Sequence, residues 1–328
     1  MKKKEGIKIM KNKFKRLIYF DEYKRINGID QYLLHSGTSY DNPVMLFLHC
    51  SGLPESMLAY TFQKKWEDIF TVVHLDQRGI GKTFTKNPNA IPTAQLILED
   101  IHEVVKYLKE KYKKEKIIIF GHSWGTLLGS MYIRKHPEDV VYYIGTGQVI
   151  NFTKGFYALY EKLKELLIKN NDEKNINILK ELGDNFPEGR SAEQYLIDAS
   201  KFTKIAQKYG LVENFVTFSY LKQFVMSPIF KLSDISAMIK SEKLQMNLVD
   251  VMLKYDIRKE SPDYKVPIYY ILGENDWQTP YSLAKEYFNE INAPRKKLYT
   301  IQNAQHGTMF NQPDLFYEAL SDVRKRES

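Results

Sequence analysis

Ser123 stands between two glycines, in the segment GHSWG (121–125). Four apolar residues, 117–120, come before this segment, and a helix-like run, TLLGSMYIRKH, comes after the tryptophan and second glycine. A serine hydroxyl is a weak nucleophile, so it needs a base to take its proton and a third group to hold that base. The G-x-S-x-G pattern is typical of a sharp strand-to-helix turn that exposes the serine above a sheet. We therefore predict that Ser123 is the nucleophile of an acyl-transfer reaction.

The partners of such a serine are expected in the chain order serine, acid, histidine. Asp276 follows the apolar run 266–273, and His306 follows the next strand-like segment, 296–304. We predict that His306 is the general base and that Asp276 orients it. Glu274 is the substitute acid.

Negative charge that develops on a substrate oxygen needs backbone N–H donors, the oxyanion hole. One predicted donor is Trp124, directly after the nucleophile. The other is expected from the loop after the apolar strand 43–50, where Ser51 and Cys50 are the candidates. We expect the side chain of His122 to leave the turn on another side and to serve packing or to form a wall of the substrate pocket.

Apolar strands alternate with helices along most of the chain, which predicts an α/β fold with a mostly parallel sheet covered on both faces. A hairpin is expected around Asn27 and Gly28, and an amphipathic helix over 93–113. Strand signals stop between 149 and 262, where helical patterns follow one another. We predict the following organisation: a basic leader over 1–16, a core over 17–148 and 263–328, and an inserted helical cap over 149–262.

Several of these segments together resemble the α/β-hydrolase superfamily, and specifically its proline-iminopeptidase-like branch. GHSWG resembles the nucleophile motif of that branch, DQRGIGKT (76–83) its D-Q-R-G-x-G-x-S segment, GEND (273–276) its acid loop and AQH (304–306) its histidine loop. HCSGLPES (49–56) lies where the branch carries H-G-G-P-G-x-P-x-S, and differs from it at residues 50–53. If those positions need positive φ angles, cysteine or leucine there would be strained.

The resemblance implies an α/β-hydrolase fold, a triad of Ser123, Asp276 and His306, and no cofactor. It implies hydrolysis of an acyl bond, often at the N-terminal residue of a small peptide. The expected function is therefore that of a serine aminopeptidase, the alternatives being a carboxylesterase for small esters and a non-catalytic ligand-binding protein. In such enzymes acidic cap residues hold the substrate's ammonium group, and the sequence does not choose among the candidates, which are Glu161, Glu165, Glu188, Glu193, Glu213 and Glu242.

DQRGIGKT also resembles the end of a nucleotide-binding loop. That reading needs a glycine where Asp76 stands and a helix that starts at the Lys-Thr pair. Because Pro88 and Pro92 follow, we expect no helix there. We instead predict that His49, Asp76 and Arg78 brace the loops around the pocket.

The 328-residue chain has a formal charge of +8, and residues 1–16 account for +7 of it. We expect this leader to be a solvated tail, with no nucleic-acid or membrane partner and no metal. Cys50 is the only cysteine, so no intrachain disulfide can form, which fits a reducing compartment. No apolar run is long enough to span a membrane, and we expect a cytoplasmic protein that acts on a small molecule or short peptide.

Overall fold

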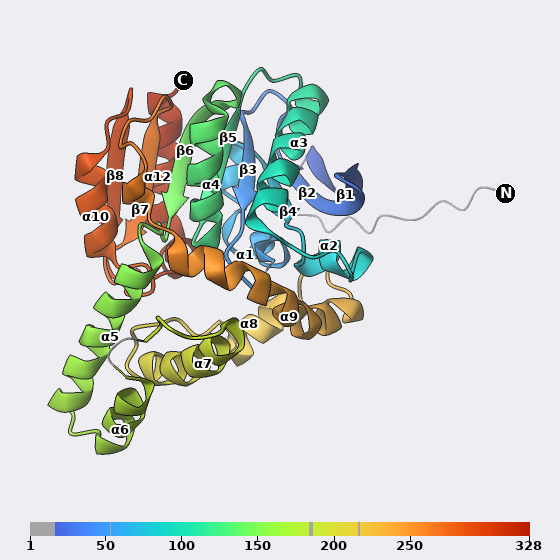
Figure 1. The fold of residues 1–328 in the computed structure, drawn as a ribbon. Helices are drawn as coiled ribbons and strands as arrows, with labels where there is room; N and C mark the ends of the chain where they lie inside the picture. The colour runs from blue at the N-terminus through green and yellow to red at the C-terminus, as the bar shows by residue number, and fades with distance from the viewer. Residues whose placement is uncertain (1–16, 53, 184–185, 216) are drawn as a thin grey trace.

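The fold is built on an eight-stranded sheet with the strand order β1-β2-β4-β3-β5-β6-β7-β8 (Figure 1). The computed structural model describes residues 17–52, 54–183, 186–215 and 217–328, so the predicted leader over 1–16 lies outside the described residues. β1 pairs antiparallel with β2, and β2 with β4, whereas the other neighbours are parallel. The strands are β1 (Ile18–Ile26), β2 (Ile29–Gly37), β3 (Val44–Leu48), β4 (Thr71–Asp76), β5 (Ile117–His122), β6 (Val140–Thr146), β7 (Ile268–Gly273) and β8 (Lys296–Ile301).

Helices cover both faces of the sheet, as the continuous apolar strands predict. On β3, Leu46 and Leu48 join one apolar core, while Met45 and Phe47 join the core on the opposite face. The first core packs against α3 (Ala94–Tyr112), α4 (Trp124–Lys135) and α10 (Tyr281–Glu290). The second packs against η1 (Glu55–Met57), α1 (Ala59–Phe62), η2 (Trp66–Asp68) and α12 (Pro313–Arg326). The predicted α/β class is confirmed.

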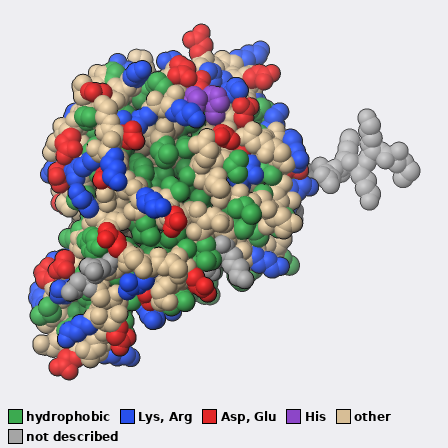
Figure 2. Space-filling model, in the orientation of Figure 1, with side chains coloured by type: hydrophobic (Ala, Val, Ile, Leu, Met, Phe, Trp, Pro, Cys, Tyr) green, Lys and Arg blue, Asp and Glu red, His purple; other side chains and the backbone are tan. Residues whose placement is uncertain are grey.

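Between β6 and β7 the chain forms a run of helices that lies beyond one end of the sheet (Figure 1). These helices are α5 (Phe152–Lys169), α6 (Glu173–Leu182), α7 (Ala192–Lys208), α8 (Phe218–Val225) and α9 (Leu232–Lys254). α5, α6 and α7 share an apolar core of their own, which Trp277 of the core domain also touches. In Figure 2, hydrophobic side chains gather at the centre of the face shown, while Lys, Arg, Asp and Glu side chains are scattered around them.

One prediction about secondary structure is wrong. We expected no helix after the segment DQRGIGKT, but Gly81–Lys86 form the short helix α2. Its early end agrees with Pro88, and its start is stabilised by the Asp76 carboxylate, whose Oδ2 accepts a hydrogen bond from the Lys82 N–H at 2.8 Å. Thr308–Asn311 add a further short helix, α11, after the histidine loop. Within the described residues, no helix is both long and apolar enough to cross a membrane.

Candidate active site

Ser123 sits in a strained turn between β5 and α4. Its φ and ψ angles are 53° and −117°, a conformation that a residue with a side chain seldom adopts. The Ser123 N–H donates to the Thr146 carbonyl at the end of β6, at 3.1 Å, which holds the turn against the sheet. Strain of this kind persists only where the surroundings fix it, and it clusters at functional sites.

The two flanking glycines are required by close backbone contacts. A Cβ atom on Gly125 would lie 2.0 Å from the carbonyl oxygen of Leu48, and one on Gly121 would lie 2.6 Å from that of Gly125. α4 can therefore press against the end of β3 and against its own preceding strand only if both residues lack a side chain. The pattern that suggested the turn in the sequence thus has a direct steric cause.

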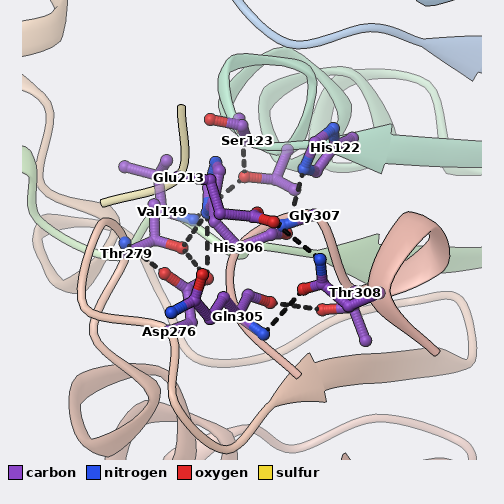
Figure 3. A network of polar contacts seen from close by, with 12 residues as sticks. His122, Ser123, Val149, Glu213, Asp276, Thr279, Gln305, His306, Gly307 and Thr308 are labelled. Carbon is purple, nitrogen blue, oxygen red and sulfur yellow. Dashed lines mark hydrogen bonds and ion pairs between the residues drawn. The ribbon is translucent and has the colours of Figure 1, made fainter. Parts of the chain in front are cut away.

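Asp276 and His306, from the loops after β7 and β8, are brought together by the fold. His306 Nδ1 donates to Asp276 Oδ2 at 2.9 Å, and both side chains are buried. Thr279 supports the carboxylate twice, through its N–H to Oδ1 at 2.9 Å and its hydroxyl to Oδ2 at 2.8 Å (Figure 3). Glu274, the substitute acid, is exposed to solvent, so the loop directs Asp276 rather than Glu274 at the imidazole.

The second ring nitrogen of His306, Nε2, is buried and has no hydrogen-bond partner among the described residues. The ring packs against Gly147, where a Cβ atom would lie 2.7 Å from His306 Cε1. Gly147 directly follows Thr146, which accepts the hydrogen bond from the Ser123 N–H. The imidazole and the serine turn therefore meet at the same strand end, although no hydrogen bond joins Ser123 Oγ to His306 within the described part of the chain. Such bonds are often long before substrate binds.

A second buried carboxylate–imidazole pair, Glu55 and His122, lies beside the first. His122 Nδ1 is 2.7 Å from Glu55 Oε1, and its Nε2 is 3.2 Å from the His306 carbonyl oxygen. The other carboxylate oxygen, Oε2, accepts the Cys50 N–H at 3.0 Å. The pair thus ties together the loop after β3, the residue before the nucleophile and the histidine loop.

The environment of His122 favours its charged form. A carboxylate and a carbonyl oxygen can only accept hydrogen bonds, so both ring nitrogens of His122 must donate. Burial lowers the pKa of this imidazole, but the charge and hydrogen bond of Glu55 outweigh burial, and the net pKa is raised above its usual value. The contacts and the raised pKa both favour a charged imidazole that pairs with the buried Glu55 carboxylate.

The loop after β3 contains the predicted oxyanion donors. Ser51 lines the cavity next to Ser123, whereas the Cys50 N–H is already used by Glu55. Trp124 is the first residue of α4, so its N–H lies at the helix start, where the first N–H groups have no partner within the helix. The one positive φ angle in the described part of this loop, 76°, belongs to Gly52, so Cys50 avoids the strain considered above. Leu53 lies outside the described residues.

The three residues assigned to loop bracing are all buried and all hydrogen-bonded. His49 Nε2 accepts the Gln77 N–H at 3.0 Å, and burial lowers the pKa of its imidazole. Burial raises the pKa of Asp76 to about 6, while the Ser56 hydroxyl stabilises its carboxylate at 2.6 Å. The Arg78 guanidinium donates two hydrogen bonds to the Asp100 carboxylate of α3, at 2.8 and 3.0 Å.

A cavity of about 280 Å³ opens between the serine turn and the cap. Its polar lining consists of Ser51, Ser123, Gln278 and Thr279 on the core side and Thr203 of α7. Aliphatic and aromatic side chains make up most of the remaining wall, and these are Trp124, Leu127, Val149, Phe152, Phe156, Leu159, Tyr195, Ala199, Phe202, Val212 and Met252. Among the described residues that line this cavity there is no Asp, Glu, Lys or Arg. The space is suited to an uncharged, apolar group.

Of the acidic cap residues considered in the sequence, Glu213 reaches the histidine loop. Its carboxylate accepts hydrogen bonds from the Gly307 N–H and, at 2.6 Å, from the Asn311 side chain (Figure 3). Glu161, Glu165, Glu188 and Glu193 are exposed, and the side chain of Glu242 lies outside the described part. Glu213 therefore links the cap to the loop that carries His306.

Two groups of side chains within the described residues could offer three metal ligands each, namely Cys50, Glu55 and His122, and His102, His136 and Asp139. In the first group, Glu55 and His122 already bond to each other. In the second, the imidazole rings stack at 4.0 Å with 17° between their planes, so their in-plane lone pairs do not converge. Neither arrangement matches a tetrahedral zinc site.

Comparison with known proteins identifies the family. The model of a family described as alpha/beta hydrolase fold matches residues 43–313, which include the serine turn, both loops of the Asp276–His306 pair and the cap. The chain belongs to the alpha/beta hydrolase family. The resemblance stated from the motifs is thereby confirmed at the level of the superfamily.

This alpha/beta hydrolase is also similar to members of the branch that its motifs resemble. It is 27% identical over 302 residues to a protein of Bacillus subtilis (strain 168) named probable aminopeptidase YbaC, covering 90% of this chain and 93% of the relative. It is 28% identical over 122 residues to the proline iminopeptidase of Neisseria gonorrhoeae, covering 36% of each chain. The crystal structure of the Mycobacterium smegmatis proline iminopeptidase aligns with a TM-score of 0.65 at 18% identity, covering 94% of this chain and 98% of that one.

Sequence reasoning missed Glu55 and Thr279. Both residues contact a histidine of the site. Glu55 was given no role although it lies in the predicted oxyanion loop, and Thr279 lies outside every motif considered. The available signal for Glu55 was an acidic residue inside HCSGLPES, a loop expected next to the nucleophile. For Thr279 it was a hydroxyl three residues after the predicted acid.

Proposed function

We propose that this alpha/beta hydrolase is a serine hydrolase that cleaves its substrate through an acyl-enzyme on Ser123. The observation that carries the proposal is the buried hydrogen bond between Asp276 and His306 Nδ1. The other ring nitrogen, Nε2, has no partner among the described residues, and the ring lies beside the serine turn. A histidine held in this way is oriented by Nδ1 and can accept a proton at Nε2.

In the proposed first step, His306 takes the Ser123 proton as the hydroxyl attacks the substrate carbonyl. The Trp124 and Ser51 N–H groups would then donate to the oxyanion, and the imidazolium would protonate the leaving group. In the second step, His306 activates a water molecule, which releases the acyl group and restores Ser123. Asp276 stabilises the imidazolium in both steps.

The proposed substrate is a short peptide or amino-acid amide that loses its N-terminal residue. Support comes from the Bacillus subtilis relative, whose similarity extends over 90% of this chain and whose name is that of a probable aminopeptidase. The apolar cavity would accept a proline or another aliphatic N-terminal residue. Glu213, which lies between α7 and α8 and bonds to the histidine loop, is a carboxylate that could attract the free ammonium group.

A second candidate function, a carboxylesterase for small esters, is favoured by one observation. The described residues that line the cavity include no carboxylate, and an ammonium group needs one. An uncharged acyl group would meet no such requirement.

Two measurements test these proposals. A fluorophosphonate probe is expected to label the wild-type chain and to leave Ser123→Ala unlabelled, whereas an intact wild-type chain that refuses the probe would favour a non-catalytic binding protein. Turnover of proline and alanine arylamides is then compared with that of short nitrophenyl esters. If only the esters react, the aminopeptidase proposal is wrong and the esterase takes its place.

A further inference from the structure

The surface formed by α8 and the first half of α9 is rich in exposed apolar side chains. Phe218 and Leu232 are 84% and 81% exposed. Five further apolar side chains on the same two helices or at the end of α8 are also exposed. We call the seven together the lid patch, which consists of Phe218, Leu221, Val225, Met226, Leu232, Ile235 and Ile239. Single exposed apolar residues are common, but a group of them marks an interaction surface.

Helix geometry makes the lid patch continuous along each helix. Phe218, Leu221 and Val225 are spaced three and four residues apart on α8, so they share one face. Leu232, Ile235 and Ile239 share a face of α9 for the same reason. Contact between the rings of Phe224 and Phe230, 6.0 Å apart, fixes the short connection between the two helices.

A helix that packs on a core buries its apolar face, but the first half of α9 exposes large apolar side chains to solvent. It buries Asp234, Ala237 and Ser241 and exposes large aliphatic side chains. Asp234 forms an ion pair with Lys82 of α2 at 2.8 Å and accepts the Lys231 N–H at 2.7 Å, so polar contacts attach this end of the helix to the core. The aliphatic side chains of the lid patch are therefore not needed for that attachment.

The exposed charged side chains within the segment that carries the lid patch, residues 217–240, all have one sign. Across the face shown in Figure 2, acidic side chains lie among basic ones. Between residues 217 and 240, by contrast, the charged residues are Lys222, Lys231 and Lys240, all exposed, and the buried Asp234.

We propose that the lid patch docks this protein onto an anionic lipid bilayer, with its apolar side chains in the headgroup region and the surrounding lysines against the lipid phosphates. Apolar side chains beside lysines on a surface helix are the features that bind a membrane interface without crossing it. A second copy of the chain is a poorer occupant, because each copy would bring the same three exposed lysines, Lys222, Lys231 and Lys240, into a two-fold contact. This proposal departs from the expectation that the protein has no membrane partner.

The test is co-sedimentation of the full-length chain with vesicles of phosphatidylcholine alone or containing about one-third phosphatidylglycerol. Wild type is expected to bind the anionic vesicles. The triple variant Phe218→Ser, Leu232→Ser and Ile239→Ser is expected to bind at least about tenfold more weakly, because it loses three inserting side chains. Ile168→Ser is the matched control, since Ile168 is 58% exposed on α5, outside the lid patch, and this variant should bind as wild type does.

Three outcomes would overturn the proposal. One is an absence of wild-type binding to either vesicle. Another is binding that the triple variant retains in full, which would assign the interaction to the basic leader alone. The third is a wild-type dimer in sedimentation velocity that the triple variant converts to a monomer, without vesicle binding, which would make the lid patch an interface between copies. Circular dichroism of each variant verifies that the fold is intact.

Discussion

Two buried carboxylate–imidazole pairs stand side by side at the same end of the sheet, and they differ in one respect. Asp276–His306 and Glu55–His122 have similar N···O distances, 2.9 and 2.7 Å, and their rings are 5.0 Å apart. Both nitrogens of His122 have an acceptor, the Glu55 carboxylate and the His306 carbonyl. His306 has a partner for Nδ1 only, as far as the described residues go.

This difference separates a histidine that can move protons from one that holds a structure. An imidazole with both N–H groups donated has no lone pair to offer, so His122 cannot act as a base while the pair is intact. Its bonds instead connect the oxyanion loop with the histidine loop. Proximity to the nucleophile is thus a poor guide to function, because His122 is adjacent to Ser123 in the sequence and His306 is far from it.

The largest expected effect on activity comes from replacing each of the two histidines by glutamine, in separate variants. We expect His306→Gln to lower kcat/KM by about 10,000-fold or more, because the proposed base is lost. His122→Gln should lower it by only about tenfold, through a less well fixed oxyanion loop. The measurement is steady-state hydrolysis of whichever arylamide or ester the wild type turns over, with circular dichroism to verify folding. Equal losses in the two variants would contradict the division of roles.

A smaller effect on activity is expected when a methyl group is placed next to the imidazole rings of His306 and His122. In Gly147→Ala the new Cβ would lie 2.7 Å from His306 Cε1 but 3.4 Å from His122 Cδ2, so His306 must move while His122 need not. We expect kcat/KM to fall by about 100-fold, as for other displacements of about 1 Å. Gly183→Ala is the matched control, because Gly183 also has a positive φ angle and a Cβ there would touch nothing within 4 Å. If both variants keep full activity, His306 is not positioned by this contact.

The smallest effect concerns stability and pH. The pKa of His122 is raised in the folded chain, so the folded state holds this proton more tightly than the unfolded state does. The stabilisation is fully present below the unfolded pKa of about 6.5 and is lost as the pH rises through the folded value. We therefore expect the free energy of unfolding of wild type to fall relative to that of His122→Gln as the pH rises above about 6.5. The fall should be at most ~1.4 kcal/mol per pH unit. Urea denaturation at several pH values measures it. Contributions from Asp76, whose pKa is also raised, are common to both proteins and cancel in the difference.

The sequence predicted the parts of the site that depend on local pattern. The serine turn could be predicted because its glycines are demanded by backbone contacts within a strand–turn–helix unit. Asp276 and His306 could be placed because each directly follows an apolar strand. Helix α2 and the Glu55–His122 pair could not be predicted. The start of α2 depends on a hydrogen bond that the Lys82 N–H donates to Asp76, and the pair depends on how a loop meets the end of a strand distant from it in the sequence. Whether the Cys50 N–H was available was likewise decided by Glu55, which lies five residues further along the chain and accepts its hydrogen bond.

The tight contact between Gly125 and the Leu48 carbonyl has a consequence for how such an enzyme can change. Every amino acid other than glycine would force α4 away from β3, and that movement would disturb Ser123 and the Trp124 N–H together. New substrate preferences therefore cannot arise by remodelling the turn itself. They must come from the cap, where Phe156, Phe202 and Met252 can each be exchanged for a smaller or larger side chain while the chemistry beneath stays unchanged.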